Sequence, residues 1–164
     1  MPARRHALAT LLAPVVIGAL VSVGGCAAAP AARVVRTDPP TLFRSPAYSN
    51  AVGVDLPPGR LVFVAGQVAR DSAGRLVGAG DVGAQTAAVF ENLRRALAAN
   101  GAGLDDLLKV TIFVTDVRAL AAIAAVRQRY LREALPASTL VEVSRLADPG
   151  WLVEIEAVAW APRR

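Results

Sequence analysis

The sequence predicts one α+β domain, a mixed sheet with two helices on one face. The main observation is the order of the predicted elements after residue 60, which is strand, helix, strand, helix, strand and strand. The chain has 164 residues, which is enough for one domain with a sizeable core and too few for two. Because helices on one side leave the other sheet face uncovered, we expect the domain to self-associate.

The first half of the domain predicts a strand, a turn and a helix. The run LVFVAGQV from Leu61 is rich in β-branched residues, and residues 71–74 (Asp-Ser-Ala-Gly) are a turn signal. Asp81 can cap the helix that comes next, and Asn100-Gly101 ends it. Between these limits, apolar side chains recur at helical spacing, namely Val82, Val89, Leu93 and Leu97.

The second half predicts a strand, a helix and two more strands. Leu107–Asp116 is dense in β-branched residues, and a helix is expected from about Arg118 to Ala134, with Pro136 preventing its continuation. The segments LPASTLVEVSRL and WLVEIEAVAW are the closing strands, and residues 147–150 join them. Alternation in the first closing strand places one set of side chains on a common face, namely Ser138, Leu140, Glu142 and Ser144.

The start of the chain has the pattern of an export signal. A short basic segment precedes an uncharged run over residues 7–32. The only cysteine, Cys26, comes directly after Val-Gly-Gly, and this segment resembles the lipobox of bacterial lipoproteins, in which the cysteine is lipidated. An ordinary cleavage site at residues 27–29 and an uncleaved anchor remain as alternatives. All three place the domain outside the cytoplasm, either lipid-anchored in the cell envelope or periplasmic.

The chain therefore divides into three expected segments. Residues 1–25 are the signal peptide, and residues 26–40 are the lipid anchor with an Ala/Pro-rich tether. Residues 41–162 are the folded domain.

Composition excludes several kinds of chemistry. The sole histidine, His6, lies in the leader, so the domain has no imidazole base and no histidine metal ligand. No glycine-rich phosphate-binding loop is present, and we expect neither a metal nor a cofactor. The formal net charge is +5, but the arginines are scattered, so nucleic-acid binding is not expected. The pair Glu154 and Glu156 on the last strand, taken alone, is more typical of a solvated sheet face than of a catalytic site.

Several segments together resemble the Rid family, the YjgF-like proteins that include enamine and imine deaminases. They are AYSNAV, VFVAGQV, the helix over residues 85–92, KVTIFVTD, LPASTLVEVSRL and VEIEAVAW, in the family's order from about Leu42 to Trp160. The resemblance implies a chorismate-mutase-like α+β fold. It also implies a homotrimer with small-molecule clefts between subunits.

The resemblance also implies roles for particular residues. Glu154 matches the glutamate that positions the attacking water, and Tyr48 matches a tyrosine of the cleft. Ser138 stands where the deaminating members carry an arginine that binds the carboxylate of a 2-imino acid. Leu140 and Ala124 stand where a cysteine and an asparagine are common in the cleft. The expected cleft is therefore less charged and more apolar than in those relatives.

The serine at position 138 has a calculable consequence. A hydrogen bond to a charged group contributes about 1.5–3 kcal/mol, so its loss should weaken recognition of an imino acid about 10- to 150-fold. Arg127 interrupts an apolar helical stripe and is one candidate for a replacement cation, although a side chain that reaches solvent or pairs across the trimer is the simpler interpretation. Two functions stay open: an imine or enamine deaminase with an altered substrate, and a non-catalytic small-molecule-binding trimer.

Overall fold

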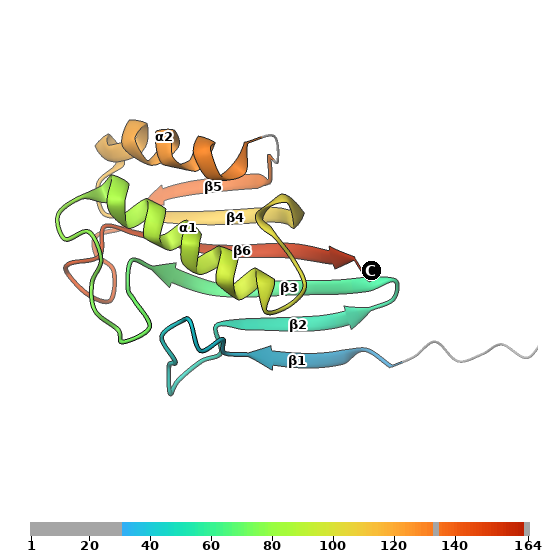
Figure 1. Cartoon of the computed structure of the whole chain (residues 1–164). Coiled ribbons are helices and arrows are strands. Elements are labelled where there is room, and N and C mark those ends of the chain that lie inside the picture. Colours follow the sequence, from blue (N-terminus) through green and yellow to red (C-terminus); the bar gives the residue numbers. More distant parts are fainter. Residues whose placement is uncertain (1–30, 133–134, 163–164) are drawn as a thin grey trace, which may run out of the picture.

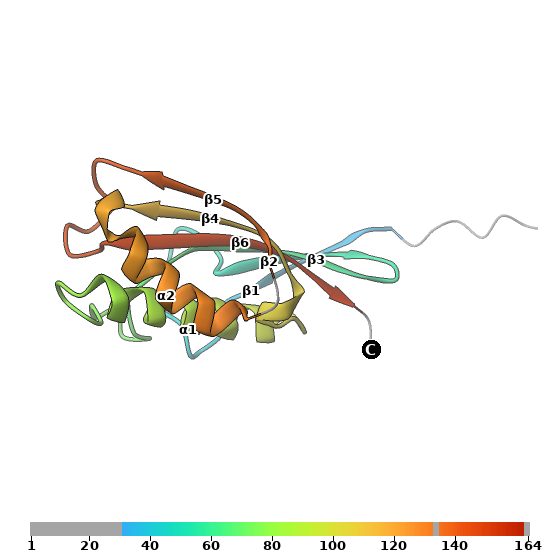
Figure 2. The same ribbon diagram turned by 90° about the horizontal axis from the view of Figure 1, so that it is seen from above.

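The computed structural model describes residues 31–132 and 135–162, which form one six-stranded sheet with two helices on one face (Figures 1 and 2). The sheet order is β1-β2-β3-β6-β4-β5. Neighbouring strands are antiparallel except for β4 and β5, which are parallel, so the predicted mixed sheet is confirmed. The elements are β1 (Arg33–Thr37), β2 (Ala51–Leu56), β3 (Gly59–Val68), α1 (Val82–Ala98), β4 (Leu107–Val114), α2 (Leu120–Leu131), β5 (Ala137–Glu142) and β6 (Val153–Pro162).

The two helices differ in how closely they match the prediction. Helix α1 begins where expected, because the Asp81 side chain accepts a hydrogen bond from the Ala84 N–H at 3.0 Å. Helix α2 is shorter than the predicted span of residues 118–134. A 3₁₀ turn over Val117–Ala119 precedes it, and the helix ends at Arg132, whose φ is 41°. The end therefore comes before Pro136, at a residue in the left-handed region.

Two strands of the sheet were not among the predicted elements. Residues 33–37, which were expected within the tether, form the edge strand β1. Strand β2 pairs with both β1 and β3. Strand β1 is short and lies beside the Ala/Pro-rich segment, and Gly53 lies in the middle of β2. Strand β2 takes its place by pairing with β3, and β1 by pairing with β2, and these pairings are not visible in the sequence.

The core lies between the sheet and the helices. Of the four apolar residues predicted along α1, Val89, Leu93 and Leu97 are fully buried and Val82 is partly buried. On β6, alternate residues from Val153 to Ala161 are buried. The remaining residues of β6, beginning with Glu154, point to the face that the helices leave open. That open face therefore carries the acidic residues of the last strand.

Two buried polar side chains of α1 fix the loops at one end of the sheet. Gln85 donates to the Gly150 carbonyl oxygen at 2.8 Å and accepts from the Leu152 N–H at 2.9 Å. Asn92 donates to the carbonyl oxygen of Arg70 at 2.9 Å. A hydrogen-bonded buried amide holds its partners in place, because an unpaired one would be costly. The helix thereby holds two loops that border a pocket at this end of the sheet.

Candidate active site

A pocket lies at the end of β3 and the beginning of β6, and its volume is about 440 Å³. We call it the Glu154 pocket. Its wall includes Tyr48, Ala65, Gly66, Arg70, Trp151 and Glu154. It therefore brings together two residues expected in the site, Glu154 and Tyr48, with a cation and an indole that were not expected there.

Strand pairing places the carboxylate of Glu154 against the backbone of Gly66. Strands β3 and β6 pair with Val68 opposite Glu154, and the register shifts between Val64 and Gln67. A Cβ atom added at Gly66 would lie 1.8 Å from Oε1 of Glu154. Only glycine at position 66 leaves the space that this carboxylate occupies.

Arg70 lies beside three aromatic side chains in the same region. Its guanidinium carbon lies 4.2 Å from the centre of the Phe43 ring and 5.6 Å from that of Trp151. One guanidinium N–H donates to the phenol oxygen of Tyr48. Cation–π contacts of this kind favour a fixed guanidinium over a freely moving one. The cation is thus held at the wall of the pocket that contains Glu154.

Glu154 differs from an ordinary surface carboxylate in its proton affinity. Burial raises the pKa of Glu154, the nearby charge of Glu156 raises it further, and Arg70 partly opposes both. A carboxylate whose pKa lies closer to neutral pH is a stronger proton acceptor. The arrangement suits a group that holds a water molecule and takes a proton from it.

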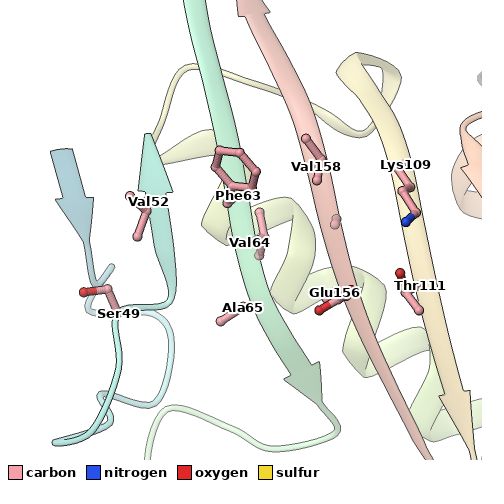
Figure 3. Close-up of a pocket in the computed structure, with 10 residues that line it drawn as sticks. Ser49, Val52, Phe63, Val64, Ala65, Lys109, Thr111, Glu156 and Val158 are labelled. Carbon is pink, nitrogen blue, oxygen red and sulfur yellow. The ribbon is translucent and has the colours of Figure 1, made fainter. Parts of the chain in front are cut away.

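A second pocket, of about 340 Å³, adjoins the first on the open sheet face and shares Ala65 with it (Figure 3). Figure 3 shows Glu156 on β6 between Ala65 of β3 and Thr111 of β4. Glu156 is exposed, whereas Glu154 is half-buried. The acidic pair therefore divides into one solvated carboxylate and one enclosed carboxylate, and only Glu154 has the surroundings expected of a catalytic group.

The other predicted site residues lie on β5 and α2, away from the Glu154 pocket. Ser138 and Leu140 lie on the edge strand β5, opposite β4 residues that are buried beneath the helices. Ala124 is an exposed residue of α2, and Arg127 on the same helix is half-exposed. In the described parts of the chain, none of these four residues lines the Glu154 pocket. Within one chain the predicted site residues therefore do not meet in one pocket.

Glu142, on the same face of β5 as Ser138, has a structural role. Its carboxylate accepts a hydrogen bond from the Val117 N–H at 2.8 Å, which caps the turn before α2. Within residues 31–132 and 135–162, no cluster of three or more His, Cys, Asp or Glu side chains could hold a metal ion. Cys26 lies outside the described residues.

Comparisons with known proteins identify the family of the chain that forms this pocket. The model of the family described as Endoribonuclease L-PSP matches residues 43–161. The chain belongs to the L-PSP endoribonuclease family. Known relatives in this family carry several names. A RutC family protein from Pyrococcus abyssi is 39% identical over 113 residues, which are 69% of this chain and 85% of that protein.

Two other members of the L-PSP family bear on the prediction made from sequence. A 2-iminobutanoate/2-iminopropanoate deaminase of Rattus norvegicus is 33% identical over 114 residues, 69% of this chain and 79% of the deaminase. The solved structure of a Rid family protein of unknown function from Yersinia pestis is 27% identical, with a TM-score of 0.69 over 77% of this chain and 98% of that one. The resemblance to the Rid family and its YjgF-type fold is therefore confirmed.

Sequence reasoning missed part of the site of this L-PSP family chain. Arg70, Phe43, Trp151 and Gly66 all contact the pocket or a residue in it, and none was among the expected site residues. The one signal in the sequence was that Arg70 comes just after the strand-forming run that begins at Leu61. The pairing of β3 with β6, which brings these residues to Glu154, joins segments about 90 residues apart.

Proposed function

We propose that this protein hydrolyses the C=N bond of a small imine or enamine and releases ammonia. The observation that carries the proposal is the half-buried Glu154 carboxylate, whose raised pKa suits a proton acceptor, in one pocket with Arg70 and Tyr48. Further support comes from the rat 2-iminobutanoate/2-iminopropanoate deaminase, which is 33% identical to this chain.

The proposed reaction needs only water and groups that can move a proton. Glu154 holds a water molecule and accepts its proton as the water oxygen attacks the C=N carbon. The electron pair of the C=N bond passes to nitrogen, which takes up a proton. The C–N bond of the resulting amino alcohol then breaks, ammonia leaves and the carbon becomes a carbonyl. A 2-imino acid would give a 2-oxo acid in this way.

We further propose that the working unit is a homotrimer. The α2–β5 edge of one chain, with Ser138 and Leu140, would lie against the Glu154 pocket of the next. A repeated head-to-tail contact of this kind closes into a ring. The open sheet face supports this assembly, because Phe63 there is 45% exposed and contact with another subunit would bury it. Light scattering on the purified full-length chain would test it, and a monomer at micromolar concentration would contradict it.

Position 138 makes the proposed substrate differ from that of the deaminating relatives. A serine hydroxyl cannot supply the charge of the arginine expected there, so a carboxylate would not be held from β5. We therefore propose an altered substrate, or the same kind of substrate bound by other groups.

For the start of the chain, we propose export and lipid attachment at Cys26, with the domain in the cell envelope. Within residues 31–132 and 135–162, no helix has the length and apolar character needed to cross a bilayer. Replacing Cys26 with serine should abolish labelling of the full-length protein with a fatty-acid analogue in a bacterial host. Labelling that persists in the variant would exclude the lipoprotein assignment.

The second candidate function is a non-catalytic trimer that binds a small molecule. The serine at position 138 favours this function, because the arginine expected there to bind the substrate carboxylate is missing. Ribonuclease activity, which the family's name suggests, has little support here. The arginines are scattered along the chain, and four of them pair with acidic residues, namely Arg60, Arg75, Arg94 and Arg118.

Replacing Glu154 with glutamine separates the enzyme from the binding protein. The variant keeps the size of the side chain but replaces one carboxylate oxygen by an NH2 group, so it cannot accept the proton of water. Loss of ammonia release with unchanged binding of a 2-oxo acid product supports the hydrolase. Binding of the 2-oxo acid without ammonia release in either protein supports the non-catalytic trimer.

A further inference from the structure

Arg70 is a cation of the Glu154 pocket that forms no ion pair within the described residues. Four other arginines of those residues each lie within 4.0 Å of an aspartate or glutamate oxygen, and Arg70 does not. Its single side-chain hydrogen bond in that part of the chain goes to the neutral phenol of Tyr48. The charge of Arg70 lowers the pKa of Glu154, but the two side chains form no ion pair, so the guanidinium donors are available to an anionic ligand.

The surroundings of Arg70 leave the binding edge of its guanidinium available. The aromatic rings of Phe43 and Trp151 contact the cation through π interactions, which use the flat faces of guanidinium groups. The N–H donors lie in the plane of the group, at its edge, and one of them is used by Tyr48. Asn92 fixes the backbone from below by its hydrogen bond to the Arg70 carbonyl oxygen at 2.9 Å.

We propose that Arg70 binds the carboxylate of the substrate, so that a cation at the end of β3 replaces the one missing at Ser138. The inference rests on the proposed function and specifies its substrate class: a small carboxylate-bearing imine whose C=N carbon lies toward Glu154. Since the Tyr48 oxygen accepts from Arg70, its own O–H can donate to the second carboxylate oxygen. A pocket of about 440 Å³ suits a small molecule.

A carboxylate site at Arg70 also accounts for a serine at position 138 in a chain that is 33% identical to a deaminase. The cation that binds the carboxylate then lies on the same chain as Glu154 and not on β5 of the neighbouring chain. Arg127, the replacement suggested by sequence, lies instead on α2 and outside this pocket in the described chain.

The test measures binding of 2-oxobutanoate and of its uncharged amide, 2-oxobutanamide, to the full-length protein by calorimetry. The wild-type protein should prefer the acid. Arg70→Gln should weaken binding of the acid about 10- to 100-fold and leave that of the amide within about two-fold. Arg60→Gln, the matched control that removes another half-buried arginine but one outside the pocket, should change neither affinity.

Three results would overturn the assignment: no preference for the acid in the wild-type protein, unchanged affinities in Arg70→Gln, or equal losses for both ligands. If Arg70→Gln does not fold, the nitrogen-15 shift of the Arg70 Nε–H in the wild-type protein decides instead. It should move with the acid and stay fixed with the amide, and a shift that stays fixed with both would refute the proposal. Failure of the hydrolase proposal gives a different pattern, in which the acid binds through Arg70 and no ammonia is released.

Discussion

Replacing Gly66 with alanine tests whether catalysis depends on the position of the Glu154 carboxylate. The added Cβ would lie 1.8 Å from Oε1 of Glu154, whereas ordinary contact begins at 3.4 Å. The oxygen must therefore move by about 1.6 Å, the difference between these two distances. A misplacement of about 1 Å can lower a catalysed rate about 100-fold, so we expect a loss of at least that size in ammonia release.

The same substitution should have little effect on folding. The obstructing atom is the end of a flexible side chain, and the φ angle of Gly66 lies outside the left-handed region, so alanine can adopt it. Overpacking costs about 1–3 kcal/mol where neighbours cannot move, and alanine recovers about 0.4–1 kcal/mol by restricting the unfolded chain. We therefore expect a net change within about 1 kcal/mol.

The assay compares initial rates of ammonia release from 2-iminopropanoate with melting curves of the same proteins. Gly53→Ala is the control, because its Cβ would meet the Arg60 side chain at 2.6 Å, outside the pocket. It should leave the rate unchanged. Normal turnover in Gly66→Ala would refute the role given to the Glu154 carboxylate, and a collapsed fold would refute the packing argument.

The charges and hydrogen bonds around the pocket give three further predictions. The rate of ammonia release should rise with pH as Glu154 loses its proton. Glu156→Gln removes a charge that raises the pKa of Glu154, so it should move this rise to lower pH. An unchanged pH–rate profile in the variant would contradict this coupling between the two carboxylates. The pKa of Glu154 is higher in the folded than in the unfolded chain, so its protonated form stabilises the fold. This contribution to the free energy of unfolding is complete at a pH below the pKa of an ordinary carboxyl group, and it is lost as pH rises through the raised pKa. Glu154→Gln should accordingly have a higher melting temperature than the wild-type protein near neutral pH. The difference between the two melting temperatures should disappear on acidification from about pH 8 to about pH 4, and a constant difference would exclude this explanation. Gln85→Leu leaves the Gly150 carbonyl and the Leu152 N–H unpaired and should cost about 1–3 kcal/mol for each in urea unfolding, whereas unchanged stability would mean that water replaces the amide.

Much of the fold could be predicted because its strongest signals are local. The cap at Asp81 and the apolar spacing of α1 depend on neighbouring residues, and both were confirmed. The alternation on β5 was also confirmed, since Ser138 pairs in register with the buried Val110 of β4. Strand β2 and the early end of α2 at Arg132 escaped prediction, because pairing and a left-handed backbone depend on tertiary contacts.

The site was less accessible from the sequence than the fold. Glu154 was named through family resemblance, since an acidic residue on a strand is usually solvated. Its distinction from Glu156 depends on burial, which is a property of the folded chain. Arg70 was missed because its partners Phe43 and Trp151 lie 27 residues before it and 81 residues after it in the chain. Only strand pairing and loop packing bring them together.

The most direct test of the central claim is ammonia release from freshly generated 2-iminopropanoate by the full-length protein, beside its Ser138→Arg variant. If Glu154 hydrolyses a C=N bond and Arg70 supplies the cation, the natural protein should accelerate release well above the buffer rate without an arginine at position 138. A natural protein at the buffer rate, with an active Ser138→Arg variant, would contradict the account, because the anchor would then have to come from β5.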